Sequence, residues 1–146
     1  MKVNIYISTS IRAPAKTKGC IEYILQAGDT DKTMTKFAFL EDATANESEV
    51  ICLKMALSHI NTKADMVLIH TDSSYMNLSL SALGQNQRFE DFKKTTKGKP
   101  RAYINEWELV HSILCTREWD IVFNQPNEFK KWLQADCSRR ATEKWK

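Results

Sequence analysis

The first third of the chain alternates short apolar runs with polar turn residues. Val3–Ile7 is an apolar run suited to a buried strand, and Cys20–Gln26 and Thr33–Leu40 follow it as two further candidate strands. Loop residues separate the first two, and a predicted turn over 28–32 separates the second and third. Successive strands that are joined by turns pair in an antiparallel manner. We therefore predict a meander of three antiparallel strands that forms one side of a sheet.

The spacing of apolar positions changes from that of a strand to that of a helix after residue 42. The segment 44–49 contains two overlapping capping-box patterns, and apolar residues recur at helical spacing over Ser48–Ile60. Met66–Ile69 is then a short apolar run suited to a strand that is buried on both faces. This strand, helix, strand order predicts a parallel pair of strands with a right-handed crossover.

The second half of the chain shows helical patterns around one short strand pattern. Its predicted elements are helices over Tyr75–Leu83, Phe89–Lys94 and Asn105–Thr116, a strand over Ile121–Phe123, and a last helix over Asn127–Lys146. The complete order predicts an α/β fold with a mixed five-stranded sheet, an antiparallel meander followed by parallel strands, flanked by helices. We expect residues 1–146 to form a single domain.

Composition narrows the class of protein further. The chain has 146 residues, of which 42% are hydrophobic and 27% are charged, as in an ordinary globular domain. No apolar run approaches the roughly 18 residues of a membrane span or resembles a signal peptide, so we expect a cytoplasmic protein without a membrane partner. The four cysteines stand singly, which favours free buried thiols. The net charge of +3 does not by itself indicate a nucleic-acid partner.

Three carboxylates stand where predicted elements begin, end or pack. Glu49 lies in the first turn of the first helix, Asp72 directly follows the buried strand, and Asp136 lies on the last helix. Ligands bind at the carboxyl ends of parallel strands, and divalent cations need several converging carboxylate oxygens. Taken singly, Asp72 is better explained as a helix N-cap, and Glu49 as a carboxylate in a favourable helix-dipole position. Only the combination indicates a metal site.

Several short motifs occur in a fixed order along the chain. They are Tyr6-Ile7-Ser8-Thr9-Ser10, Thr44-x-Asn46-x-x-Glu49, Thr71-Asp72-Ser73, Lys97-Gly98-Lys99-Pro100 with Asn105 and Leu109, and Asn127-Glu128 with Ala135-Asp136. In this order they resemble the type-one ribonuclease H family. That family has a Tyr-Thr-Asp-Gly-Ser strand end, a Thr-x-Asn-x-x-Glu helix start, a Thr-Asp-Ser strand end, a basic segment before a helix, and Asn-Glu and Ala-Asp near the end.

The resemblance implies a ribonuclease H-like fold and hydrolysis of the RNA strand of an RNA/DNA hybrid by two divalent cations, Mg²⁺ or Mn²⁺. It implies that Glu49, Asp72 and Asp136 are catalytic residues and metal ligands, with Ser8 at the position of the family's first metal-bridging Asp. It also implies nucleic-acid contacts by Asn46, Ser73, Lys93, Lys94, Lys97, Lys99, Arg101 and Asn105. A solvated charged face is the alternative interpretation of the lysine-rich segment.

Two departures from the family weaken the implied activity. Ser8 is a neutral hydroxyl that cannot supply the charge and bridging oxygens of a carboxylate, and residues 124–127 lack the family's Gly-His loop. The sequence therefore predicts a nucleic-acid-binding domain whose two-metal hydrolysis is weakened or lost. Two alternatives stay open. One is an active hybrid endonuclease in which another carboxylate, Glu22 or Asp42, replaces the missing ligand, and the other is a protein-interaction module on the same fold.

Overall fold

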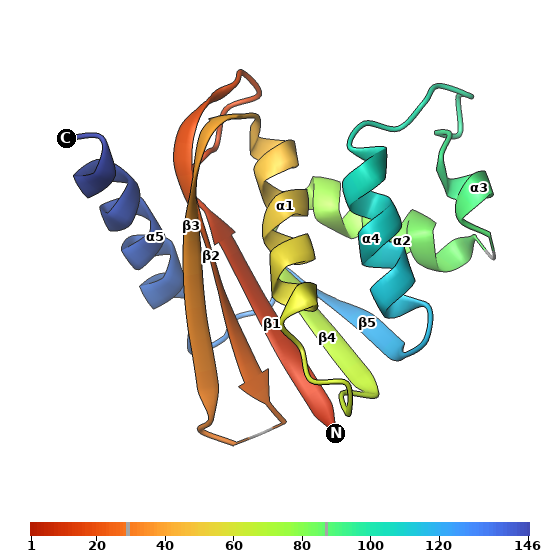
Figure 1. Ribbon diagram of the computed structural model, residues 1–146, viewed down its shortest axis with the longest axis horizontal. Coiled ribbons are helices and arrows are strands. Elements are labelled where there is room, and N and C mark those ends of the chain that lie inside the picture. The colour runs from red at the N-terminus through yellow and green to blue at the C-terminus, as the bar shows by residue number, and fades with distance from the viewer. Residues whose placement is uncertain (29, 87) are drawn as a thin grey trace.

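A mixed five-stranded sheet organises the computed structural model, which describes residues 1–28, 30–86 and 88–146 (Figure 1). The strands are β1 (Lys2–Thr9), β2 (Thr17–Ala27), β3 (Thr33–Ala43), β4 (Met66–Thr71) and β5 (Glu118–Phe123). They lie in the order β3-β2-β1-β4-β5, antiparallel from β3 to β1 and parallel from β1 to β5. This confirms the predicted sheet. The predicted turn over 28–32 includes residue 29, which lies outside the described residues.

Helices cover both faces of this sheet (Figure 1). They are α1 (Ala45–Ser58), α2 (Ser74–Gln85), α3 (Phe89–Phe92), α4 (Ile104–Leu114) and α5 (Lys130–Lys144). Both α1 and α5 pack on β1 and β2, from opposite sides. Within the described residues, none of the helices has the length and apolar character needed to cross a bilayer.

Strand alternation divides the apolar side chains into two clusters. Ile5 and Tyr23 point to the α1 face and join the main core. Tyr6 and Ile24 point to the other face and pack against Leu133 of α5. Successive side chains of a strand alternate between faces, so each of these strands contributes to both clusters. The α5 face carries the smaller cluster, and it is the face along which polar side chains of β1 and β4 also lie.

Two helices, α1 and α5, begin three residues away from the predicted position, because of local hydrogen bonds. The first helix begins at Ala45, three residues earlier, because Oγ1 of Thr44 accepts a 3.1 Å hydrogen bond from the backbone N–H of Glu47 and caps the helix. The last helix begins at Lys130, three residues later, because Oδ1 of Asn127 accepts a 3.0 Å hydrogen bond from a backbone N–H two residues on and forms a turn.

The start of α4 is tied to the start of α1. Tyr103, which precedes α4, has a left-handed backbone conformation with φ of 61°, uncommon for a residue other than glycine. Its hydroxyl lies 2.8 Å from Oγ1 of Thr44, the N-cap of α1. The segment that precedes Tyr103 therefore leaves the helical layer from a point that is fixed relative to α1.

Candidate functional site

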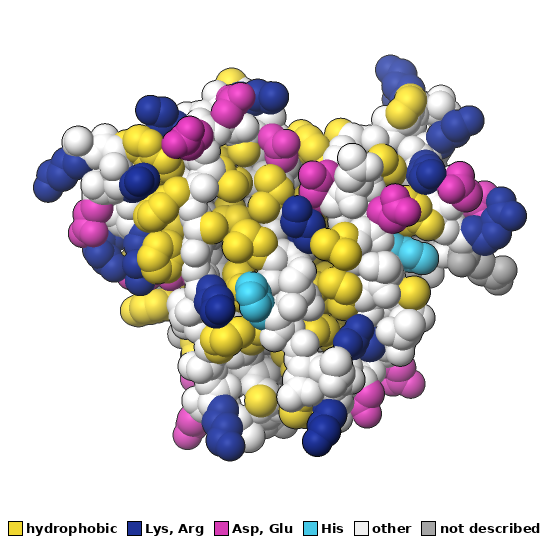
Figure 2. Space-filling model, in the orientation of Figure 1, with side chains coloured by type: hydrophobic (Ala, Val, Ile, Leu, Met, Phe, Trp, Pro, Cys, Tyr) yellow, Lys and Arg dark blue, Asp and Glu magenta, His cyan; other side chains and the backbone are white. Residues whose placement is uncertain are grey.

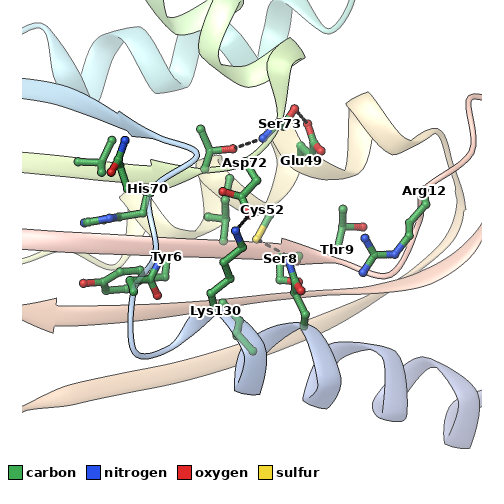
Figure 3. A pocket seen from close by; sticks show the side chains of 17 residues that line it. Tyr6, Ser8, Thr9, Arg12, Glu49, Cys52, His70, Asp72, Ser73 and Lys130 are labelled. Atoms are coloured by element: carbon green, nitrogen blue, oxygen red, sulfur yellow. Dashed lines mark hydrogen bonds and ion pairs between the residues drawn. The ribbon is translucent and has the colours of Figure 1, made fainter.

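The carboxyl ends of β1 and β4 and the start of α5 enclose a pocket of about 200 Å³ (Figure 3). Ser8 lines it from β1, Glu49 from α1, and Asp72 and Ser73 from the turn between β4 and α2. The structure thus brings together four of the residues singled out in the sequence. They meet because parallel strands present their carboxyl ends at one edge of the sheet, where α1 also begins.

Glu49 is held at the pocket by the N-cap of α2. The hydroxyl of Ser73 donates a 2.6 Å hydrogen bond to Oε2 of Glu49, and it accepts a 3.1 Å hydrogen bond from the backbone N–H of Met76. Burial raises the pKa of Glu49, and the hydrogen bond from Ser73 acts in the opposite direction. Ser73 therefore caps a helix and orients a carboxylate at the same time.

The end of β1 is fastened to α1. The hydroxyls of Thr9 and Ser48 are 2.8 Å apart, and the thiol of Cys52 lies 3.8 Å from the backbone oxygen of Ser8. The side chain of Ser8 itself receives or donates no hydrogen bond among the described residues. Its hydroxyl is thus positioned by the backbone alone and is available to a ligand in the pocket.

A lysine of α5 reaches into this pocket. Nζ of Lys130 lies 2.6 Å from Oδ2 of Asp72, and both side chains are about two-thirds shielded from solvent. Figure 3 shows the Lys130 side chain extending from α5 to Asp72, with Arg12 at the far end of the pocket. The carboxylates that line the pocket, Glu49 and Asp72, are therefore matched in number by the basic side chains of Arg12 and Lys130. Neither basic residue is among those that the sequence predicts at the site.

Asp136, the third predicted metal ligand, does not line the pocket. It follows Lys130 by six residues, which turns its side chain by about 600° around α5, or 240° net, and moves it about 9 Å along the axis. Its carboxylate accepts hydrogen bonds of 2.6 Å from Arg139 and 2.8 Å from Arg140. Gln134, one helical turn after Lys130, lines the pocket in its place. Lys130 and Gln134 lie on the same face of α5, and the packing of that helix on the sheet turns this face to the pocket.

Neither of the alternative carboxylates reaches the pocket. Glu22 is the cross-strand partner of Ser8, but its buried carboxyl lies 3.3 Å from Nε of Arg140 on α5. Asp42 is exposed near the end of β3. In the part of the chain that the structure describes, no group of three or more His, Cys, Asp and Glu side chains could hold a metal ion. The residues present therefore do not fit a two-metal site.

The carboxyls of Glu22 and Asp136 form a separate buried acidic pair between β2 and α5. Both carboxyl oxygens of Glu22 are buried, and no described residue donates a hydrogen bond to either of them. Burial, together with the neighbouring Asp136, raises the pKa of Glu22 to about 8. The hydrogen bond with Glu22, and those from Arg139 and Arg140, hold the pKa of Asp136 well below its usual range. Near neutral pH the pair thus favours a single negative charge.

This pair predicts that stability falls as pH rises. The folded-state pKa of Glu22 is above its ordinary value of 4.5, so the fold favours the protonated form. This contribution to stability is complete below about pH 4.5 and is lost as pH rises through about 8. We expect the melting temperature of the unchanged protein to fall, relative to that of Glu22→Gln, between about pH 5 and pH 9. Glu41→Gln, at an exposed position of β3, is the control. Parallel curves for all three proteins would contradict the assignment.

An aromatic and polar network extends the pocket along β1 and β4. Tyr6 and His70 are register partners on these strands, and their rings stack with centroids 4.2 Å apart. Nε2 of His70 lies 2.9 Å from Oδ1 of Asn4, and burial lowers the pKa of His70. This network was not predicted from the sequence, since only the β1 to β4 register brings the two rings together.

The residues predicted to contact nucleic-acid phosphates fall into two groups. Arg101 serves the fold: its Nε donates a 2.6 Å hydrogen bond to the backbone oxygen of Phe92, and its guanidinium lies 4.5 Å from the centre of that ring. Lys93 pairs with Glu90 at 2.9 Å. Figure 2 shows basic side chains gathered at the outer tip of the segment between α3 and α4. The exposed members, called here the tip lysines, are Lys94, Lys97 and Lys99.

The two predicted asparagine contacts lie on helix starts. Asn46 is exposed in the first turn of α1, and Asn105 is exposed in the first turn of α4. Neither lines the pocket. Both remain available to a ligand that extends beyond it.

Comparison with known proteins agrees with this architecture. The RNase H family model matches residues 1–123. No curated protein sequence matches the chain significantly. RNase H1 of the halophilic archaeon Halobacterium salinarum is similar in structure, with a TM-score of 0.69, 15% identity and 99% of each chain covered. A foamy viral protease-reverse transcriptase solved with double-stranded DNA has a TM-score of 0.70 and 21% identity, covering 97% of this chain and 91% of that one.

A third similar structure is LC11-RNase H1 in complex with an RNA/DNA hybrid, with a TM-score of 0.69, 15% identity and 97% of each chain covered. At these identities the structures establish the fold, which is the predicted ribonuclease H fold, and the family model establishes the membership. The chain belongs to the RNase H family.

Proposed function

We propose that this chain is a nucleic-acid-binding domain that recognises RNA/DNA hybrids, and that its two-metal hydrolysis is weakened or lost. The observation that carries the proposal is the pocket itself. Ser8 stands where the resemblance places a metal-bridging Asp, and the ammonium of Lys130 lies 2.6 Å from the carboxylate of Asp72. The family's hydrolysis relies on divalent cations, which need more carboxylate charge than these residues provide.

Two observations support a hybrid as the ligand. LC11-RNase H1 and a foamy viral protease-reverse transcriptase were each solved with an RNA/DNA hybrid. In this chain, the tip lysines project from the segment that resembles the family's basic grip on the hybrid. Lysines in such a position can neutralise backbone phosphates without reading the base sequence.

Different residues of the chain then contact different parts of the ligand. The tip lysines contact the backbone at one end of the ligand, and the pocket receives a second part of it. Glu49, held by Ser73, offers a carboxylate acceptor to a ribose hydroxyl, which is the group that distinguishes RNA from DNA. Such contacts position a strand and need no bond cleavage.

Salt dependence tests the role of the tip lysines. Replacing Lys94, Lys97 and Lys99 together with Gln should weaken hybrid binding and flatten the dependence of its affinity on salt. Each lost phosphate contact lowers the slope by about 0.9 for a B-form duplex. Fluorescence anisotropy over a series of salt concentrations measures both quantities.

The matched control removes the same charge from the opposite end of the sheet. It replaces Lys32, Lys36 and Lys63, which are exposed. The solvated-face interpretation is correct if the two triple variants have the same slope. Cleavage of a labelled hybrid in Mg²⁺ or Mn²⁺ should be slow or absent in the unchanged protein, and efficient cleavage would favour the active-endonuclease alternative.

A further inference from the structure

The ion pair between Lys130 and Asp72 is built into the fold. Lys130 is the first residue of α5, and Leu133, one turn later, anchors that helix against Tyr6 and Ile24. Asp72 directly follows β4, whose last residue pairs with Phe123 of β5. Both partners therefore start from well-positioned backbone, and the 2.6 Å contact joins two elements that lie far apart in the sequence.

This arrangement places a positive charge where the family places a cation. A divalent ion bound to Asp72 would have to displace the ammonium of Lys130 or sit beside it, and like charges a few ångströms apart repel. The pocket offers little compensation, because Arg12 and Lys130 already balance Glu49 and Asp72. Asp136 cannot assist, because it is held by Arg139 and Arg140.

The ammonium of Lys130 also has N–H donors that its contact with Asp72 does not use. A lysine carries three N–H donors, and one of them suffices for Oδ2 of Asp72. Ser8, Arg12, Asn127 and Gln134 line the same pocket and carry further hydrogen-bond donors. Lysine binds phosphate as a point charge, and arginine and amide donors complete the contacts to phosphate oxygens.

We propose that Lys130 is the resident cation of this pocket: its ammonium takes the place of a divalent metal ion at Asp72 and receives a backbone phosphate of the bound nucleic acid. The domain then binds its ligand without metal. This inference rests on the proposed function for the identity of the ligand. The exclusion of metal from Asp72 is independent of that identity.

The experiment compares Lys130→Gln with Lys131→Gln. Lys131 is the next residue on α5 and is exposed, so both variants lose one charge at the same end of the same helix. Melting temperatures are measured in chelator and in millimolar Mg²⁺ at equal ionic strength. We expect Mg²⁺ to leave the unchanged protein and Lys131→Gln unaffected, and to raise the melting temperature of Lys130→Gln by at least about 2 °C.

Hybrid affinity in chelator is the second measurement. The unchanged protein should bind equally well in chelator and in Mg²⁺, within about twofold. Lys130→Gln should bind at least about fivefold more weakly in chelator, and Lys131→Gln should match the unchanged protein.

Three results would overturn parts of this inference. If Mg²⁺ raises the melting temperature of the unchanged protein as much as that of Lys130→Gln, the metal displaces the lysine from Asp72, and Lys130 does not exclude metal. If Lys130→Gln behaves as Lys131→Gln in both measurements, Lys130 is not the resident cation. If the unchanged protein binds no hybrid under either condition, the proposed function and the phosphate contact fail, while the melting temperatures still decide whether Lys130 excludes metal.

Discussion

A protein that carries both Ser8→Asp and Lys130→Gln is expected to cleave an RNA/DNA hybrid in Mg²⁺ at least about tenfold faster than the unchanged protein, equivalent to roughly 1.4 kcal/mol of barrier. The first change supplies the missing carboxylate at the end of a strand that the sheet already positions. The second removes the ammonium from Asp72. Each single variant is expected to gain less, because either the ligand or the freed carboxylate is missing.

The same double variant should depend on metal for its stability. In chelator, the carboxylate introduced by Ser8→Asp would crowd Glu49 and Asp72 without a neighbouring lysine, so the melting temperature of the double variant should fall below that of the unchanged protein. Millimolar Mg²⁺ should reverse this order. Adding Glu49→Gln is the control for contaminating nuclease. Equal cleavage by the triple and double variants, or indifference of the double variant to Mg²⁺, would show that this pocket cannot be restored as a metal site.

Arg140→Met is expected to lower the free energy of unfolding at neutral pH by about 3 kcal/mol, because it removes one partner of a buried charge cluster. Asp136 is 9% exposed and Glu22 is fully buried, and Nε of Arg140 lies 2.8 Å and 3.3 Å from their carboxyl oxygens. The guanidinium also lies 3.8 Å from the centre of the Phe37 ring. Methionine preserves part of the packing and loses the charge. Urea denaturation measures the difference.

Arg139→Met is the matched control for this prediction. Arg139 also pairs with Asp136, at 2.6 Å, but it is 53% exposed, and exposed ion pairs contribute at most about 1 kcal/mol. We expect Glu22→Gln to restore part of the stability of Arg140→Met, because it removes one of the two acids that the arginine neutralises. If Arg140→Met and Arg139→Met lose equal amounts of free energy of unfolding, burial of the charge cluster does not increase the contribution of Arg140 to stability.

Most of the fold was predictable from the sequence because local patterns and topology rules act together. The apolar runs at Val3–Ile7 and Met66–Ile69 are adjacent parallel strands inside the sheet, and α1 directly precedes the second of them, in the order that favours parallel pairing. Helix ends were less predictable. They depend on single side-chain hydrogen bonds, such as that of Asn127, which a periodic pattern does not reveal.

The candidate site was predictable where backbone geometry alone positions the residue. Ser8 and Asp72 stand at strand ends, and these meet at one edge of the sheet. Glu49 also reaches this edge, although the earlier start of α1 places it in the second helical turn rather than the predicted first. The position of Asp136 was not predictable, because the packing of Leu133 against Tyr6 and Ile24 decides which face of α5 meets the pocket, and the sequence pattern does not show that packing. Lys130 was overlooked for the same reason.

The hydrogen bond between Tyr103 and Thr44 sets the distance between two regions that are proposed to contact the ligand. It fixes the departure point of the tip lysines relative to α1, the helix that also carries Glu49 to the pocket. A ligand that engages both places must therefore span a set distance. The affinity for a duplex should increase sharply once the duplex is long enough to reach both the tip lysines and the pocket. In Tyr103→Phe the increase of affinity with duplex length should be more gradual, while binding at either end is retained.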